Sequence, residues 1–236
     1  MKRPDRAGAV VVFAKVPEPG QVKTRMSPPL APTQAAEFYA AMLEDVLEAT
    51  ANFADALGLE PVVALHPASA CAEWKSRVPP GYRVIPQRGH SLAERMARAV
   101  EDESGGERGP VLLRGSDSPA LPQARLAEAL AALATHDIAI APDLDGGYSL
   151  IGLNRPWPGL FSHPMSTDRV LADTLAQAQR LGARASLLEP CFDLDRFDDL
   201  RVLRRAREGP EAALCPRTLG YLDEARLWPA SAEPGD

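Results

Sequence analysis

The sequence is poor in cysteine and histidine and has no long apolar run. Its three cysteines, Cys71, Cys191 and Cys215, are far apart and form no C-x-x-C pair. This spacing argues against a zinc ribbon and against a disulfide scaffold, and it suits a reducing cytoplasm. The sequence has no run of about 18 apolar residues, the length that spans a bilayer, and its N-terminal residues show no signal-peptide pattern. We therefore expect a cytoplasmic protein with no membrane partner and no histidine-based metal site.

Lysine is scarce as well. Only four of the 26 basic residues are lysines, and two of those, Lys15 and Lys23, lie within nine residues of each other. The net charge of −6 argues against nucleic acid as a partner. Proline is abundant in contrast: 23 prolines and 17 glycines make about one residue in six, below the share of a low-complexity chain. With 45% hydrophobic and 25% charged residues, the composition is that of an ordinary globular protein.

Apolar runs alternate with helical patterns along the chain. Strands are predicted at Ala9–Ala14, Pro61–His66, Tyr82–Pro86, Val111–Leu113, Ile138–Ala141, Tyr148–Ile151 and Ala185–Leu188. Helices are predicted at Thr33–Leu57 with Thr33 as N-cap, at Ser91–Glu103 with a Ser91–Glu94 capping box, and at Pro122–Ala134, Thr167–Leu181 and Phe197–Arg207. This alternation predicts an α/β fold, a Rossmann-like mixed, mostly parallel sheet with helices on both faces. The short Asp-Gly-Gly-Tyr link leaves no room for a crossover, so its two strands should be antiparallel.

One domain is expected over residues 9–228, with an N-terminal extension at 1–8 and a flexible C-terminal tail at 229–236. Ligands of such sheets bind beyond the carboxyl ends of the strands, so the loops at those ends are the places to look for a site.

The first strand leads into a loop that is rich in cations and prolines. Lys15, Lys23 and Arg25 supply positive charge, Pro17 stiffens the chain and Gly20 allows a positive φ. Lysine is a compact charge that suits phosphate, although no G-K-[S/T] motif of a P-loop is present. The loop is therefore either a phosphate-binding loop or a solvated basic loop, and we favour phosphate.

A carboxylate follows the strand Val111–Leu113, in Arg114-Gly115-Ser116-Asp117-Ser118-Pro119. Asp117 is well placed to hold a divalent cation, because magnesium prefers one or two carboxylates together with substrate phosphates. Asp117 also suits an ordinary turn. Further along, alternation places Asp193 and Asp195 on one side of an extended segment, so Asp195 is either a helix cap or a second metal ligand.

Two more loops carry polar groups. Gln87 offers donors and an acceptor to a base edge, and Gly89 and the helix start at Ser91 offer backbone groups to phosphate or ribose. A plain loop with a good cap is the alternative. The segment Asp143-Leu144-Asp145-Gly146-Gly147-Tyr148 is either a simple hairpin or a place where carboxylates and an aromatic ring hold an acceptor.

Five motifs occur in an order that resembles the rSAM/selenodomain-associated transferase 1 family. They are F-A-K-V-P-E-P-G-Q-V-K-T-R-M, Q-R-G-H-S-L-A-E-R-M, G-S-D-S-P-A-L-P, D-L-D-G-G-Y-S-L-I-G-L and D-L-D-R-F-D-D-L, between about Ala9 and Leu203. The resemblance implies the GT-A, or nucleotide-diphospho-sugar transferase, fold. It also implies kinship with the guanylyltransferases of molybdenum-cofactor and deazaflavin-cofactor synthesis.

The resemblance further implies a site. Nucleotide-binding residues would be Lys15, Pro17, Gly20, Lys23, Arg25, Gln87, Gly89, Ser91 and Ser116, with Lys23, Arg25 and Asp117 catalytic. Asp117 and Asp195, with Asp193 as second choice, would hold Mg²⁺ or Mn²⁺, and Asp145, Gly146, Gly147 and Tyr148 would face a small-molecule acceptor.

The implied activity is that of a Mg-dependent transferase that takes a nucleotide-activated donor, with a glycosyltransferase using a nucleotide sugar as the first choice. A nucleotidylyltransferase that releases pyrophosphate is the alternative, because Ser116-Asp117-Ser118 offers one carboxylate where a typical GT-A enzyme has Asp-x-Asp. A non-catalytic nucleotide-binding domain is the third hypothesis.

Overall fold

A seven-stranded sheet organises the part of the chain that the computed structural model describes, residues 7–104 and 109–230. The strands are β1 (Ala9–Lys15), β2 (Glu60–His66), β3 (Arg83–Pro86), β4 (Val111–Gly115), β5 (Ile138–Pro142), β6 (Tyr148–Leu153) and β7 (Ala185–Leu187). Their order across the sheet is β3-β2-β1-β4-β6-β5-β7. Each strand lies within a residue or two of its predicted range.

The sheet is mixed and mostly parallel, as predicted. Only β6 runs against its neighbours, pairing antiparallel with β4 and with β5. The antiparallel pairing of β5 and β6 confirms the prediction from the short Asp-Gly-Gly-Tyr link. The insertion of β6 between β4 and β5 was not predicted, because local patterns carry no information about which strand lies beside which.

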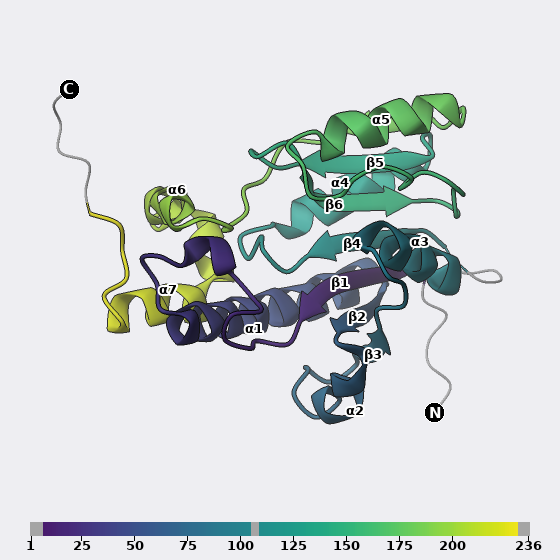
Figure 1. Cartoon of the computed structure of the whole chain (residues 1–236). Coiled ribbons are helices and arrows are strands. Elements are labelled where there is room, and N and C mark those ends of the chain that lie inside the picture. The colour runs from purple at the N-terminus through teal and green to yellow at the C-terminus, as the bar shows by residue number, and fades with distance from the viewer. Residues whose placement is uncertain (1–6, 105–108, 231–236) are drawn as a thin grey trace, which may run out of the picture.

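Helices cover both faces of the sheet (Figure 1). They are α1 (Pro32–Leu57), α2 (Cys71–Trp74), α3 (Leu92–Glu103), α4 (Gln123–Leu133), α5 (Val170–Arg180), α6 (Leu200–Ala206) and α7 (Pro216–Glu224), with short 3₁₀ turns at Thr24–Met26, Ala68–Ala70, Phe197–Asp199 and Pro210–Leu214. Strand alternation sends Val12 and Ala14 of β1 towards α1 and α7, and Val11 and Phe13 towards α3 and α5.

Three predicted helix boundaries were wrong. The first helix has Ala31 at its N-cap and Pro32 at its first position, where the missing N–H of proline costs nothing, so Thr33 is not the cap. The helix predicted from Thr167 begins at Val170, and the helix predicted from Phe197 opens with a 3₁₀ turn.

Helix α7, which was not predicted, is held to α1 by a buried carboxylate. Asp45 of α1 accepts hydrogen bonds from the backbone N–H of Arg217 and of Thr218 and from the Thr218 hydroxyl, at 3.1, 2.8 and 2.8 Å. These N–H groups belong to the first turn of α7, where a negative charge is stabilising. A residue 172 positions away thus caps this helix.

No helix in the described ranges is long and apolar enough to cross a membrane. Residues 1–6 of the predicted extension and 231–236 of the predicted tail lie outside the described residues, and the single-domain boundaries stay a prediction.

Candidate functional site

A cavity of about 720 Å³ opens at the carboxyl ends of β1 and β4 and at the loop that joins β5 to β6. It lies where the fold predicts ligand binding, and its size suits a nucleotide-sized molecule. Its wall on the α3 and α5 side is apolar, formed by Phe13, Leu92, Met96, Leu113, Ile151, Met165 and Val170. The loops at the strand ends line the rest of the cavity and carry most of its charged side chains.

The loop after β1 places Lys23 against Asp117. The Lys23 Nζ lies 2.5 Å from Asp117 Oδ1, and the Lys23 side chain is 2% exposed. Lys23 adopts a left-handed backbone conformation, φ 48° and ψ 36°, which is uncommon for a residue with a Cβ. The ammonium also lies 5.9 Å from the centre of the Tyr39 ring. The backbone is thus bent to bring one buried cation to the carboxylate that follows β4.

A second ion pair joins the same loop to the segment after β7. Arg25 Nη1 donates to Asp195 Oδ2 at 2.7 Å, and the pair is partly exposed, with 51% and 29% of the side chains accessible. Of the two carboxylates predicted to hold a metal, Asp117 and Asp195, each therefore has a cation beside it.

Buried polar contacts fix the loop that carries Asp117. Arg114, fully buried on β4, donates to Thr50 Oγ1 at 2.7 Å and to the Ser118 carbonyl at 2.8 Å. Burial lowers the pKa of Arg114 to about 10, because removal from water disfavours the charged form of the guanidinium. Arg114 thereby ties the Asp117 loop to α1.

Tyr39 connects the first loop to the same region. Its hydroxyl accepts from the Lys15 backbone N–H at 3.0 Å and shares a hydrogen bond of 2.8 Å with Ser116 Oγ. Burial, with the negative charge of Asp117 nearby, raises the pKa of this phenol well above its ordinary value. Ser116 thus lines the cavity with its hydroxyl already paired.

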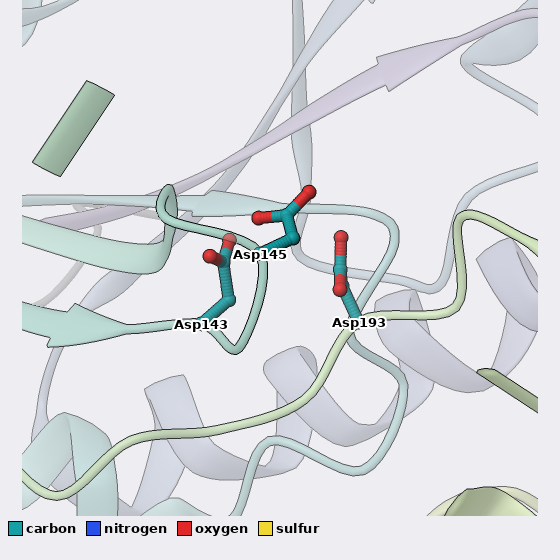
Figure 2. Close-up of side chains that lie close together, drawn as sticks. All are labelled: Asp143, Asp145 and Asp193. Carbon is teal, nitrogen blue, oxygen red and sulfur yellow. The ribbon is translucent and has the colours of Figure 1, made fainter. Parts of the chain in front are cut away.

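Three further carboxylates gather at the same cavity as Asp117. Figure 2 shows Asp143 and Asp145 on the loop between β5 and β6, beside Asp193 on the segment that follows β7, and oxygen atoms of all three lie within 4.8 Å of one another. Burial and the Asp145 carboxylate raise the pKa of Asp143 to about 8. Burial and Asp145 also raise the pKa of Asp193 to about 6. Three oxygen donors that repel one another are a set that a hard divalent cation would relieve.

The two glycines after Asp145 allow the tight turn that brings the Asp143 and Asp145 carboxylates together. Gly147 N–H donates to Asp143 Oδ1 at 2.7 Å, and a Cβ on Gly147 would lie 2.9 Å from Asp143 Oδ2. Gly146 has φ +92° and no room for a Cβ, which would meet the Asp168 carbonyl at 2.0 Å. Gly147, Asp145 and Tyr148 line the cavity, whereas Gly146 is not among the described residues that line it.

The loop after β3 uses its polar groups internally. Gln87 Nε2 donates to the carbonyls of Ala14 at 3.0 Å and Ala64 at 2.9 Å, so of the donors and acceptor predicted for a base edge only Oε1 remains. Ser91 is the N-cap of α3, and its hydroxyl accepts a hydrogen bond from the Glu94 N–H. The Glu94 carboxylate accepts from the backbone N–H of His90 and not from that of Ser91.

The remaining predicted nucleotide-binding residues divide by position. Lys15, Lys23, Arg25, Gln87 and Ser116 line the cavity, and among the described residues Pro17, Gly20, Gly89 and Ser91 do not. A Cβ on Gly89, at φ +136°, would lie 2.7 Å from Glu94 Cβ, so a close approach to α3 explains this glycine.

Sequence reasoning did not assign Asp143 to a metal, and it did not assign Arg95 or Tyr39 at all. The two Asp-Leu-Asp triplets at 143–145 and 193–195 are a signal for the acidic group, since they repeat one spacing after different strands. No sequence pattern distinguishes Arg95 or Tyr39 from other helix residues.

Residues 49–167 match the model of a family described as an uncharacterized protein conserved in bacteria, DUF2064. The chain belongs to the DUF2064 family. The matched region runs from α1 to Thr167 and includes the Asp117 loop and the loop between β5 and β6. None of the curated proteins matches this DUF2064 protein significantly. The resemblance to the rSAM/selenodomain-associated transferase 1 family stays a prediction.

Solved structures share the fold of this DUF2064 protein. A Desulfovibrio desulfuricans G20 protein, provisionally described as a nucleotide-diphospho-sugar transferase, is 28% identical with a TM-score of 0.79, over 93% of this chain and 98% of that one. A 4-diphosphocytidyl-2C-methyl-D-erythritol synthase is 16% identical with a TM-score of 0.55, over 86% and 99%. A CMP:2-keto-3-deoxy-manno-octonic acid synthetase solved with CTP is 14% identical with a TM-score of 0.51, over 84% and 96%. The likeness to the last two shows the fold alone.

Proposed function

We propose that this DUF2064 protein is a divalent-metal-dependent transferase that takes a nucleotide-activated donor, with a nucleotide sugar as the first choice. The observation that carries the proposal is the cavity itself, which combines six carboxylates, several cations and an apolar wall at the carboxyl edge of an α/β sheet. The 28% identical structure, described as a nucleotide-diphospho-sugar transferase, supports the choice of donor.

The residues fit a divalent cation. Asp143, Asp145 and Asp193 offer carboxylate oxygens close together, and Asp117 and Asp195 lie at the same cavity. Oxygen-only donors at this density suit Mg²⁺ or Mn²⁺ rather than zinc. The metal, when bound, would neutralise charge on the donor's phosphates as a Lewis acid. The sequence predicted Asp117 and Asp195 as metal ligands, with Asp193 as second choice. We now propose Asp143, Asp145 and Asp193 as ligands beside Asp117 and Asp195.

The cations of the β1 loop supply the rest of the charge balance. Lys23 and Arg25 are held beside Asp117 and Asp195, so each lies next to the place where a metal-bound phosphate would arrive. A carboxylate that turns to a metal frees its lysine or arginine to stabilise negative charge on the leaving group. The apolar wall would cover the flat face of a base or sugar, and Gln87 Oε1 would accept from a base N–H.

Nucleotidyl transfer is the second candidate. It is favoured by the lone carboxylate between Ser116 and Ser118, where a typical GT-A enzyme has Asp-x-Asp. In that reaction an acceptor attacks the α-phosphate of a nucleoside triphosphate and pyrophosphate leaves. In the glycosyl reaction a nucleoside diphosphate leaves and the sugar moves.

The test is a thermal-shift screen of nucleoside triphosphates and nucleotide sugars with Mg²⁺, with Mn²⁺ and with EDTA, followed by mass spectrometry of the products. Metal-dependent cleavage of a nucleotide sugar supports the first candidate, and pyrophosphate release supports the second. Stabilisation by a nucleotide without turnover favours the third hypothesis, a non-catalytic nucleotide-binding domain. Absence of any stabilisation contradicts all three.

A further inference from the structure

The charges of the cavity are unevenly distributed. Six aspartates line it: Asp168 precedes α5, and the other five, Asp117, Asp143, Asp145, Asp193 and Asp195, lie at the ends of β4, of β5 and of the segment after β7. Of the cations at that end, Lys23 and Arg25 are each paired with one of these five carboxylates, and Arg196 follows Asp195 in the chain. That end therefore has an excess of negative charge, which suits a metal better than a bare phosphate.

Two other cations line the cavity away from these acids. Lys15 ends β1, and Arg95 lies on α3, the helix that covers this part of the sheet (Figure 1). Alternation along β1 sends Phe13, and with it Lys15, to the face that α3 covers. Both side chains therefore reach the cavity from the same side of the sheet.

Neither cation is paired with a carboxylate of the described residues. In that part of the chain, the Arg95 side chain forms one hydrogen bond, from Nε to the Gly89 carbonyl at 3.1 Å, and no ion pair. This bond fixes the guanidinium plane but uses none of its terminal N–H₂ groups. Lys15 likewise has no ion-pair partner in the described part of the chain.

His66 is influenced by the charges of both cations. It ends β2 directly opposite Lys15 in the parallel register. Burial lowers the pKa of His66, and the charges of Arg95 and Lys15 lower it further. The positive charges of both cations thus act on one ring, although His66 itself is not among the described residues that line the cavity.

We infer that Lys15 and Arg95 form an anion subsite that holds a phosphoryl group of the ligand, separate from the acidic end that takes the metal. The inference rests on the proposed function for the identity of the whole ligand, but not for the phosphate itself. An arginine presents parallel N–H groups to phosphate oxygens and a lysine adds a point charge, so the pair suits a phosphate more than a neutral sugar. The cavity would then orient its ligand by charge, with a phosphate at the β1 end and the metal-bound part at the acidic end.

The test is a calorimetric titration of the full chain with inorganic pyrophosphate in EDTA, which leaves only metal-independent binding. We expect Lys15→Gln and Arg95→Gln each to weaken this binding by about tenfold, the effect of one charged hydrogen bond. Arg98→Gln is the matched control, because Arg98 is an exposed arginine of the same helix that does not line the cavity. Asp193→Asn should bind pyrophosphate at least as tightly as the wild type, since it removes negative charge.

Pyrophosphate binding that is absent in EDTA, or unchanged in both Lys15→Gln and Arg95→Gln, overturns the subsite. A loss confined to Lys23→Gln and Arg25→Gln overturns it too and places the anion at the β1 loop. Lys15→Gln keeps the test decisive if Arg95→Gln fails to fold, because the Lys15 side chain is exposed. The metal-dependent screen with nucleotides is a separate experiment. If no nucleotide binds in that screen but pyrophosphate binding still depends on Arg95, the proposed function is refuted and the anion subsite is supported.

Discussion

The Lys23 ammonium and the Asp117 carboxylate meet at 2.5 Å across 94 residues of sequence, with the lysine buried and the aspartate half exposed. The half-exposed Asp117 carboxylate can rotate to ligate a metal. The buried Lys23 ammonium cannot move away in the same way, so it would then pair with another anion nearby. Removing Asp117 leaves a buried, unpaired charge, and removing Lys23 leaves an exposed carboxylate that water can solvate.

Lys23→Met is therefore expected to fold but to bind its nucleotide ligand at least about tenfold more weakly, because it lacks the charge that would meet the phosphates. Calorimetry with the ligand identified in the screen measures the affinity. Lys75→Met serves as control, because Lys75 is an exposed lysine that follows α2 and does not line the cavity. Equal affinity of Lys23→Met and the wild type would refute a phosphate role for Lys23.

Substitution of the carboxylates should separate metal binding from folding. We expect Asp143→Asn and Asp193→Asn to abolish the stabilisation that Mn²⁺ confers in thermal unfolding while leaving the metal-free protein folded, because each replaces one of three adjacent carboxylates by a neutral amide. Asp117→Ala should remove metal-dependent activity as well. Undiminished stabilisation by Mn²⁺ in Asp143→Asn would exclude this carboxylate from a metal site, and exposed Asp198, substituted by Asn, is the control.

The raised pKa of Asp143 predicts a dependence of stability on pH. An unfolded aspartate loses its proton near 3.8, whereas folded Asp143 keeps it to about 8, so the folded state binds more protons between these values. The contribution of this group to the free energy of unfolding therefore falls as the pH rises through that interval. In EDTA, the stability of Asp143→Asn relative to the wild type should increase between about pH 5 and pH 8.

Urea unfolding of both proteins at several pH values measures this difference. Added Mn²⁺ should stabilise the wild type more at the higher pH, because the metal competes with protons for the same oxygens. A stability difference that is independent of pH would contradict the raised pKa.

The Asp45 cap predicts a large effect on stability and none on the site. Asp45→Ala should lower the free energy of unfolding by about 3 kcal/mol, because it leaves a set of buried donors at the start of α7 without an acceptor. Urea unfolding measures the loss, with Asp55→Ala, an exposed aspartate of the same helix, as control. A similar, small effect in both variants would contradict the capping role.

The secondary structure of the sheet could be predicted because its strands are local apolar runs. Ala9–Ala14 and Ile138–Ala141 are buried on both faces, and their sequences are continuously apolar. Helix α7 could not be predicted in the same way. It has nine residues and no capping side chain of its own, and it depends on Asp45, which lies in another helix.

The loops of the candidate site could be predicted from their positions at strand ends, but their pairings could not. Lys15 ends a strand, Lys23, Asp117 and Asp145 follow strands, and all four line the cavity. The sequence contains nothing to say that Lys23 is buried against Asp117, or that Arg25 lies beside Asp195. These pairs are separated by 94 and 170 residues, and no local rule relates them.

By itself the sequence determined the α/β class, the strands and the loops that bear the chemistry, because hydrophobic period and turn residues act over a few neighbours. The tertiary structure alone decided that β6 lies between β4 and β5, which brings the loop of Asp143 and Asp145 to the segment of Asp193 and creates the acidic end of the cavity. The tertiary structure also left Lys15 and Arg95 without acidic partners among residues 7–104 and 109–230. The fold thus separates the two lysines that line the cavity, because Lys23 is buried against a carboxylate and Lys15 is exposed.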